Sequence, residues 1–233
     1  MEVAAQYGRV KGGEWFSLLH KKDIMVLGQG GIGSWTSLLI SRIGCNLYLF
    51  DHDRFEQHNM SGQLVRAKDI NKRKTDAVTE IIKEFSPDAT VESDGMYKED
   101  SSVSNIMICG FDNMEARKLA FRKWREFLML IPESQRKYCF FQDGRLNAEL
   151  LQIFNIPGDD YAFIEEYEST HLFNGDEVPP QPCTFSQTTH CAAMIAGHMV
   201  GFLTNWITNA NSDTPMRAVP HFWEYIAPLN LML

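Results

Sequence analysis

A glycine-rich stretch near the start of the sequence, GQGGIG, has residue types and a spacing that suit phosphate binding. An apolar run at residues 24–27 precedes it, and an apolar segment that continues to about residue 43 follows it. This order predicts a strand, a tight turn and a helix, and the free N–H groups at such a helix start bind phosphate. Glycine is needed there because a Cβ would hold the backbone away from the ligand. The candidate residues are Gly28, Gly30, Gly31 and Gly33.

Polar side chains after the second apolar segment, residues 45–50, narrow the choice of ligand. By itself the glycine turn fits NAD, a nucleoside triphosphate, or a helix packed tightly on a sheet with no ligand. Asp51 lies 18 residues after Gly33, close to the place where an acidic residue contacts ribose hydroxyls in dinucleotide-binding folds. A dehydrogenase needs little more than that acidic residue. This chain adds further polar side chains at Asp53, Asn59, Gln63, Lys74 and Asp112.

The ordered set of motifs resembles the ThiF/MoeB-type adenylyltransferases, a superfamily that also contains the adenylation domains of ubiquitin-activating enzymes. The family pattern has a GxGGxG turn, a D-x-D strand end, an N-x-x-R-Q loop, a lysine that opens the next helix, and D-N-x-x-A-R. The resemblance covers roughly residues 20–130. It rests on the four glycines and on Asp51, Asp53, Asn59, Gln63, Lys74, Asp112, Asn113, Ala116 and Arg117.

The resemblance implies that ATP and Mg²⁺ are used to activate the C-terminal carboxylate of a small protein or peptide partner as an acyl-adenylate. A carboxylate that approaches a polyphosphate is repelled, so such a site must neutralise charge and hold the reacting groups in line. Lys74 would then carry positive charge to the phosphates, and Asp112 would hold Mg²⁺. Asp51 would bind the ribose, while Asn59 and Gln63 would orient phosphate and ribose oxygens.

Simpler roles stand beside these. Lys74 is also the last lysine of the run KRK, where a solvated surface lysine is common. Asp112 precedes a predicted helix and could cap its N-terminus, a role that is compatible with metal binding. We interpret Arg117 as a structural arginine on the same helix.

The chain departs from the family pattern at Gly62, which stands where the N-x-x-R-Q motif has a phosphate-binding arginine. Arg54 or Arg66 could reach in from nearby, and Arg145, at the end of a predicted fifth strand, could supply the missing charge or form a plain salt bridge. Arg9 loosely matches a family arginine that reaches the site from a neighbouring subunit. The loss at Gly62 leaves open a nucleotide-binding scaffold without catalysis.

The five cysteines are scattered and never form a CxxC pair, which argues against a disulfide framework and a structural zinc site. Cys183 precedes a threonine and resembles the thioester cysteine of ubiquitin-activating relatives. A thiolate there could take the acyl group, and His190 could lower its pKa. The alternative is a buried structural cysteine. The remaining cysteines are predicted to be structural: Cys45, Cys109, Cys139 and Cys191.

The order of apolar segments predicts an α/β fold with a doubly wound, mainly parallel sheet, Rossmann-like and ThiF-like, followed by a C-terminal antiparallel and helical extension. We expect one domain over residues 1–233, with a leader at 1–22, a nucleotide-binding core at 23–145 and a C-terminal part at 146–233. Residues 158–183 are acidic and aperiodic, which predicts a long surface loop or crossover before a buried helix at 185–209. A second helix should bury Ala77, Ile81, Ile82 and Phe85.

The composition of the 233 residues, 44% of them hydrophobic, is ample for a sizeable core, and the formal net charge is −8. That charge argues against nucleic acids and membrane surfaces as partners, because phosphate groups are repelled. The N-terminus lacks the continuous apolar core of a signal peptide, and the cysteine usage favours a reducing cytoplasm. We expect a homodimer, in keeping with the family and with the apolar end of the chain. An NAD-dependent oxidoreductase is the remaining alternative, although it leaves Asn59, Gln63, Lys74 and Asp112 unexplained.

Overall fold

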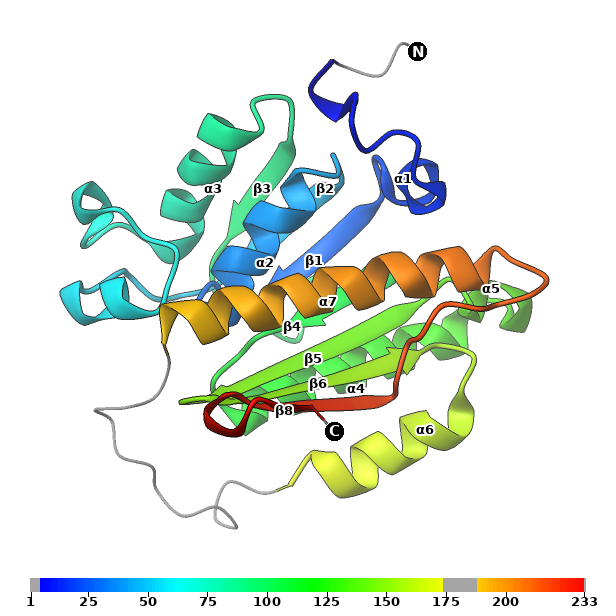
Figure 1. Ribbon diagram of the computed structural model, residues 1–233. Helices are drawn as coiled ribbons and strands as arrows, with labels where there is room; N and C mark the ends of the chain where they lie inside the picture. The colour runs from blue at the N-terminus through cyan, green and yellow to red at the C-terminus, as the bar shows by residue number, and fades with distance from the viewer. Residues whose placement is uncertain (1–4, 174–187, 233) are drawn as a thin grey trace.

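One sheet forms the centre of the computed structural model, which describes residues 5–173 and 188–232 (Figure 1). Within these residues the strand order is β3-β2-β1-β4-β5-β6-β7-β8. The pairs from β3 to β5 are parallel and those from β5 to β8 are antiparallel. The strands are β1 (Asp23–Leu27), β2 (Asn46–Phe50), β3 (Thr90–Asp94), β4 (Ile106–Cys109), β5 (Phe140–Asn147), β6 (Leu150–Pro157), β7 (Phe222–Ile226) and β8 (Leu231–Met232).

Helices cover both faces of this sheet, so the predicted α/β class with an antiparallel extension is confirmed. One face packs against α1 (Glu14–Leu19), α2 (Gly31–Ser41), α3 (Lys74–Phe85) and α7 (Thr189–Ala210). The other packs against α4 (Met114–Leu130) and α6 (Tyr161–Glu166). The shorter helices are η1 (Ala5–Tyr7), η2 (Gln57–Ser61), η3 (Ala67–Asp69), α5 (Glu133–Arg136), the π-helix η4 (Tyr167–His171) and η6 (Ala227–Leu229).

Helix α3 shows how apolar spacing directs packing, and where the sequence prediction was wrong. Ile81 follows Ala77 by four residues and Ile82 is its neighbour, so all three lie on one side of the helix and are buried against the sheet, as predicted. Phe85 was expected on the same stripe, but its side chain is 55% exposed. It is the last residue of the helix, beyond the part that the sheet covers.

The segment predicted as a surface loop, residues 158–183, is partly helical. It begins with α6, where the Asp160 carboxylate caps the helix by accepting from Phe163 N–H. The helix continues into the π-helical turn η4, and Phe163, Ile164 and Tyr167 are buried. Because acidic residues separate these buried positions, the sequence showed no clear apolar periodicity, and the helix was not predicted. Residues 174–187 lie outside the described part of the chain.

Helix α7 runs across one face of the sheet (Figure 1) and packs against α1, α2, β5 and β6. By length and composition alone, within the described residues, it is long and apolar enough to cross a membrane. Here Cys191 is buried, as predicted, and Trp206 stacks on Phe140 with ring centroids 4.5 Å apart. His198 is half-buried and lies 4.3 Å from Trp223, centroid to centroid. Helix α7 is therefore a packed element of this domain.

The residues predicted as a leader take part in the core. Tyr7, Phe16 and Leu19 are buried, and α1 packs against α7. The Tyr7 ring also lies beside His20, with centroids 5.0 Å apart, next to Gly44 at the entrance to β2. This segment therefore sits at the N-terminal ends of the strands.

Substitution of two glycines tests how much space the structure leaves for a side chain at Gly33 and at Gly197. A Cβ on Gly33 would lie 1.7 Å from the Gly28 carbonyl oxygen, whereas a Cβ on Gly197 would meet nothing within 4 Å. We expect Gly33→Ala to lower the free energy of unfolding by about 3 kcal/mol or more through this backbone clash. The control, Gly197→Ala, should raise it by about 0.5–1 kcal/mol, because alanine favours an exposed helix. Urea denaturation measures both, and equal effects would contradict the packing described here.

Candidate active site

The glycine turn joins β1 to α2 at the C-terminal ends of the parallel strands, where open α/β sheets bind their ligands. Gly28 has φ +86°, and a Cβ there would lie 2.9 Å from the Gly110 carbonyl oxygen after β4. Gly30, just before α2, makes no side-chain cap, and a Cβ on it would meet only the Gln63 amide, at 4.0 Å. The turn thus presents uncapped helix N–H groups beside open space, which suits an anion.

Asp51 ties the glycine turn to the loop after β2. Its carboxylate is 8% exposed and accepts from Gln29 N–H at 2.6 Å and from Asp53 N–H at 2.8 Å. Each oxygen keeps a lone pair for a further donor. The role of Asp51 in binding a ribose hydroxyl stays a prediction.

The loop that contains η2 packs on the first turn of α2. The Ser34 hydroxyl donates to the Gly30 carbonyl at 2.6 Å and accepts from Leu64 N–H at 3.0 Å. Trp35 Nε1–H donates to the carbonyl of Gly62 at 3.4 Å. These bonds hold the loop over the glycine turn and bring Gln63, which is distant in sequence, to the site.

Gln63 carries the clearest sign of a missing ligand. Its side chain is 9% exposed, and its Oε1 is buried without a hydrogen-bond partner among the described residues. An unpaired buried acceptor costs about 1–3 kcal/mol, so native proteins rarely keep one without a reason. Its amide faces Gly30, where a bound nucleotide would offer hydroxyl and amino donors. Asn59, predicted to share this task, uses its Oδ1 to accept from Glu56 N–H and so stabilises η2.

Lys74 lies at the start of α3 and is 8% exposed, so it is no solvated surface lysine. Its Nζ donates to the Asp53 carboxylate at 2.9 Å, and its backbone N–H donates to the Asp53 carbonyl. A short antiparallel bridge between Arg54 and Arg73 brings these two segments together. The structure therefore holds the Lys74 ammonium beside Asp53, on the loop that Asp51 ties to the glycine turn.

Asp112 follows β4 and is exposed. Its predicted capping role is wrong, because Asn113 caps α4 by accepting from Ala116 N–H at 2.8 Å. Within the described residues, the Asp112 carboxylate accepts a hydrogen bond only from the Asn113 amide, at 3.5 Å. Gly110 and Phe111, just before it, approach the glycine turn closely. Asp112 is thus a free hard ligand at the edge of the site, and its role in Mg²⁺ binding stays a prediction.

None of the arginines considered as replacements at Gly62 is free to take that role. Arg66 is surrounded by the carboxylates of Asp69, Glu80 and Glu84. Arg54 donates to the Asn71 carbonyl at 2.7 Å.

Arg145 donates from Nε to Asp143 at 2.7 Å and from Nη2 to the His171 carbonyl at 2.8 Å. It is half-buried and pairs with a fully buried carboxylate, so it is a structural arginine rather than part of a surface salt bridge. Arg9 is exposed on the turn after η1, at the opposite ends of the strands, so it does not reach this chain's own site. Its role toward a second copy stays a prediction.

The side chains of Asp51, His52 and Asp53 have donor atoms within 4.8 Å of one another, a spacing that a metal ion could use. Two observations argue against that use. Backbone N–H groups already bind both oxygens of Asp51, and the Lys74 ammonium binds Asp53. A cation there would meet a fixed positive charge, so Asp112 remains the better candidate ligand.

The four cysteines that the structure describes are structural, as the sequence predicted. Cys45, Cys109, Cys139 and Cys191 are buried and free. Burial raises the pKa of Cys45 and of Cys139 to about 12, so neither is a nucleophile at neutral pH. Cys183, the candidate thioester cysteine, lies outside the described residues.

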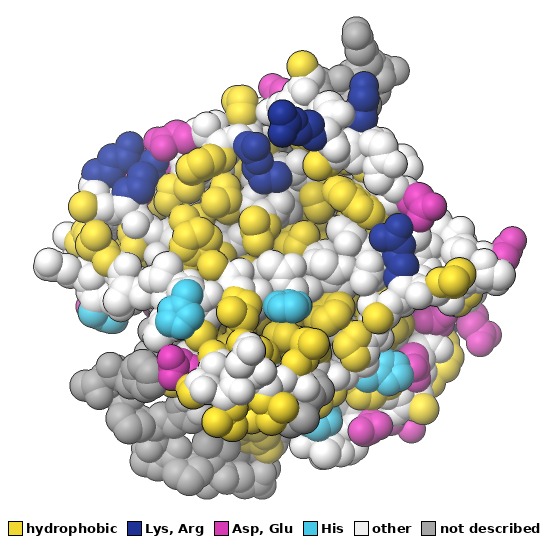
Figure 2. All heavy atoms as spheres, in the orientation of Figure 1, with side chains coloured by type: hydrophobic (Ala, Val, Ile, Leu, Met, Phe, Trp, Pro, Cys, Tyr) yellow, Lys and Arg dark blue, Asp and Glu magenta, His cyan; other side chains and the backbone are white. Residues whose placement is uncertain are grey.

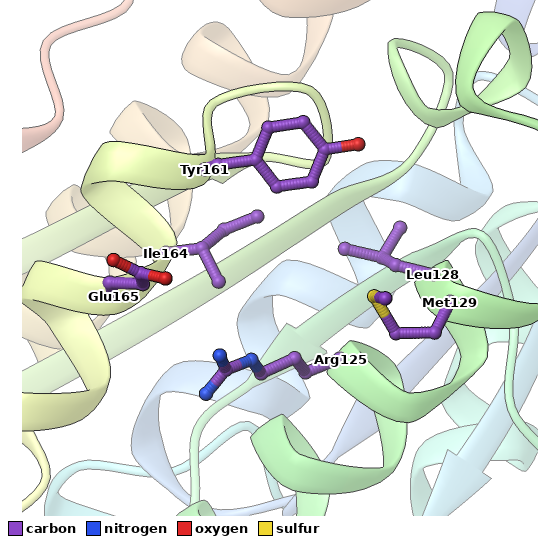
Figure 3. Close-up of a pocket in the computed structure, with 6 residues that line it drawn as sticks. All are labelled: Arg125, Leu128, Met129, Tyr161, Ile164 and Glu165. Atoms are coloured by element: carbon purple, nitrogen blue, oxygen red, sulfur yellow. The ribbon is translucent and has the colours of Figure 1, made fainter.

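A surface cavity between α4 and α6 has a volume of about 200 Å³ and is drawn in Figure 3. Its lining includes Leu128, Met129 and Ile164, with the charged ends of Arg125 and Glu165 at its sides. Arg125 is the eleventh residue after the start of α4, so the cavity lies roughly 16 Å along that helix from the Asp112 end. It shares no residue with the glycine turn and belongs to a different part of the surface.

Comparison with known proteins identifies the family. The sequence matches the ThiF family over residues 5–227, and the chain therefore belongs to that family. It is similar to ubiquitin-like modifier-activating enzyme 5 of Bombyx mori, with 30% identity over 79 residues, and of Oryza sativa subsp. japonica, with 35% identity over 72 residues. Those segments are 34% and 30% of this chain but only 20% and 17% of the relatives.

Solved structures agree on the fold. The selenomethionine form of PaaA superposes with a TM-score of 0.69 at 16% identity, covering 94% of this chain and 65% of that one. E. coli MccB with ATP gives a TM-score of 0.68 at 14% identity, covering 94% and 64%. The chain therefore spans just under two thirds of these neighbours and about a fifth of the curated relatives. At such identities the structural likeness shows the fold alone.

Sequence reasoning missed two groups of residues that shape the site. Gln29, inside the glycine turn, is fully buried and links the turn to Val26, Ser37 and Asp51. A polar residue at the end of an apolar strand was the available signal. Asp143 and Tyr167 form a buried hydrogen bond of 2.9 Å, and no local pattern joins these distant segments.

The Asp53–Lys74 pair should contribute to stability in a pH-dependent way. Burial raises the pKa of Asp53, but the hydrogen bond and charge of Lys74 outweigh it and bring the pKa below its usual value. The pair therefore stabilises the fold above the unfolded-state pKa, about 4, and this contribution is lost as the pH falls through the lower folded-state value. Because Asp53 is half-exposed, we expect less than about 1 kcal/mol.

Urea denaturation of wild type and Asp53→Asn at pH 7 and at pH 3 measures this contribution. Wild type should have a higher free energy of unfolding than Asp53→Asn at pH 7, and this difference should shrink toward zero at pH 3. Lys74→Met removes the same pair from the other side and should show the same loss of pH dependence. A difference that stays constant between the two pH values would contradict the assignment.

Proposed function

We propose that this protein is an ATP-dependent adenylyltransferase that activates the C-terminal carboxylate of a small protein or peptide, of the ubiquitin-like or sulfur-carrier-like kind, as an acyl-adenylate. The observation that carries the proposal is the Gln63 amide, buried above an uncapped glycine turn, whose oxygen has no hydrogen-bond partner in the part of the chain that the structure describes. Asp51 lies on one side of that turn, and the buried Lys74 is held on the same loop.

The residues present fit ATP and Mg²⁺. Helix α2 offers uncapped N–H groups and a positive dipole end for phosphate oxygens. Asp51 has lone pairs left for a ribose hydroxyl, and the Gln63 amide supplies both an acceptor and donors. Lys74 supplies positive charge, and Asp112 supplies a free carboxylate for the metal ion. Bound ATP would supply an activated α-phosphate to the incoming carboxylate.

The Asp53–Lys74 bond defines what Lys74 must do in this function. Asp53 holds the ammonium near the site in a single position, so little side-chain entropy is lost when it turns to a phosphate oxygen. The exposed side of Asp53 allows water to solvate the carboxylate after that exchange. We therefore assign Lys74 to charge neutralisation and Asp53 to its placement.

The partner class follows from the relatives and from the chemistry. The curated relatives are named as ubiquitin-like modifier-activating enzymes, and E. coli MccB has been solved with ATP and with MccA. A terminal carboxylate is the natural acceptor for an adenylate-forming site of this kind. The identity of that partner is part of the proposal.

A homodimer in the cytoplasm is the assembly we propose. Figure 2 shows hydrophobic side chains spread over the face that carries α2 and α7. They include half-buried side chains of both helices, and the neighbouring strand β8 exposes Leu231 and Met232. A second copy on this side of the molecule would cover apolar surface, and Arg9 of that copy is our candidate for its contribution to the site. Four buried, unpaired cysteines among the described residues suit a reducing compartment.

The main competing function is a nucleotide-binding scaffold without catalysis. Gly62 favours it, because Arg54, Arg66 and Arg145 are all bound elsewhere in the described residues. An NAD-dependent oxidoreductase is the second. Calorimetric titration with ATP, with and without Mg²⁺, and with NAD separates the ligands, whereas turnover separates enzyme from scaffold.

ATP–pyrophosphate exchange tests the proposal. With a panel of small β-grasp proteins and peptides that end in a free carboxylate, we expect wild type to exchange label with at least one of them. Lys74→Met should lower that rate by about 100-fold or more, because a site that binds developing negative charge loses its cation. Asp112→Asn should act mainly by raising the Mg²⁺ requirement.

Lys68→Met is the matched control, since Lys68 is an exposed lysine that pairs with Glu84 away from the turn. It should leave the rate unchanged. Full activity in both Lys74→Met and Asp112→Asn would refute the assignment. ATP binding without exchange for any partner would establish the scaffold instead.

The fate of the adenylate can be tested at Cys183. If the acyl group passes to this thiol, wild type should form a covalent adduct with the partner that dithiothreitol removes. Cys183→Ser should form a more stable oxyester that resists the reductant, and Cys191→Ser, a buried neighbour in sequence, should behave as wild type. An adduct that persists unchanged in Cys183→Ala would exclude this role.

A further inference from the structure

A buried ionic network joins the Asp112 loop to the helical segment α6–η4. At its centre is the carboxylate of Asp143 on β5, which is fully buried and opposite Cys109 of β4 in the sheet register. Its Oδ1 accepts from Arg117 Nη1. Its Oδ2 accepts from Arg145 Nε at 2.7 Å and from the Tyr167 hydroxyl at 2.9 Å. One carboxylate thus binds three donors from three different elements.

On one side the network reaches the peptide that precedes Asp112. Arg117 Nη2 donates to the carbonyl of Phe111, and both terminal nitrogens of Arg117 donate to the Gly144 carbonyl at 3.2 Å. Phe111 is the neighbour of Asp112, so the guanidinium fixes the peptide plane from which the Asp112 side chain leaves. Arg117 is itself buried, which limits its freedom to move.

On the other side the network holds the π-helical turn. Arg145 Nη2 donates to the His171 carbonyl, and the Arg145 guanidinium lies over the ring of Phe154, 4.6 Å from the centroid. Burial raises the pKa of Tyr167 to about 12, so its hydroxyl keeps the proton that it donates to Asp143. A π-helical turn is rare, and here two side chains bound to Asp143 hold it: Tyr167 within the turn and Arg145 at the His171 carbonyl.

The charge of the network is unbalanced. Two guanidinium groups share one buried carboxylate, and the carboxylate of Asp112 also acts on the charge of Arg117. Removing Asp143 would leave the buried Arg117 and the half-buried Arg145 without the carboxylate that neutralises them, so the network constrains both ends strongly. The structure therefore couples a candidate metal-binding loop to a segment that lies far away in sequence.

We propose that Asp143 is a positioning residue that fixes the Asp112 loop through Arg117 and the turn η4 through Arg145 and Tyr167, so that the Mg²⁺ site and η4 move as one body. The part that concerns Mg²⁺ rests on the proposed function. The mechanical coupling does not, since it follows from the bonds of the described residues alone.

Hydrogen exchange measured by mass spectrometry tests the coupling without any activity. Tyr167→Phe keeps the buried ring and removes only the hydroxyl bond to Asp143. We expect the amides of residues 110–118 to exchange about fivefold faster in this variant, as the loss of one hydrogen bond of average strength implies. Asp143→Asn should have a larger effect in the same direction.

Ser169→Ala is the matched control, because Ser169 lies on the same π-helical turn and donates only to the Glu165 and Glu166 carbonyls. It should leave exchange in residues 110–118 unchanged. Faster exchange confined to residues 161–171 in Tyr167→Phe would overturn the proposal. An equal rise in Ser169→Ala would also overturn it, because loosening of the turn alone would then suffice.

The Mg²⁺ dependence of ATP–pyrophosphate exchange tests the functional part. Tyr167→Phe should raise the apparent KM for Mg²⁺ about fivefold while kcat at saturating Mg²⁺ is kept, by the same loss of one hydrogen bond. A lower kcat with an unchanged KM for Mg²⁺ would overturn the assignment to metal positioning. A wild-type protein without exchange activity would refute the proposed function, and the hydrogen-exchange result would still decide the coupling.

Discussion

The site depends on how closely three backbone segments approach one another at the ends of the central strands. The Gly28 carbonyl occupies the space that a Cβ on Gly33 would need, and Gly110 lies against both Gly28 and Gly33. Only glycine permits this approach, so the turn, the start of α2 and the end of β4 form one rigid corner. Asp51, through Gln29, and Asp112, two residues after Gly110, are positioned by that corner.

The charged side chains near this corner form ion pairs. Lys74 pairs with Asp53 on the loop after β2, and Asp143 pairs with Arg117 and Arg145 at the ends of β4 and β5. Ion pairs of this kind add little net stability, because desolvation offsets their attraction. What they supply is a fixed position for each charge. Electrostatic stabilisation of a phosphoryl transfer needs charges that are already in place, and in the proposed function the Lys74 ammonium would meet that need.

Local signals predicted most of the fold and part of the site. The parallel strands, α2, α3 and α4 followed from apolar runs and helical spacing, and Gly28, Gly33 and Asp51 from their order along the chain. Contacts between distant segments could not be predicted. The Lys74–Asp53 bond depends on a bridge between two loops, and the cap at Asn113 rather than Asp112 depends on where α4 begins. The turn η4 is held by Asp143 and Arg145, which no pattern within residues 158–183 reveals.

Gly62 shows how these constraints combine. Its carbonyl accepts from Trp35, and the loop on either side is tied to α2 through Ser34 and Leu64, so the backbone of the motif keeps its position without an arginine. Glycine at position 62 therefore removes the positive charge of the family arginine but leaves the loop conformation that places Gln63 over the glycine turn. Among the described residues, the positive charges left for the proposed phosphate binding are the Lys74 ammonium and the N-terminus of α2. In the proposed function the site would depend on that one ammonium group, and Asp53 holds it in a buried position rather than in solvent.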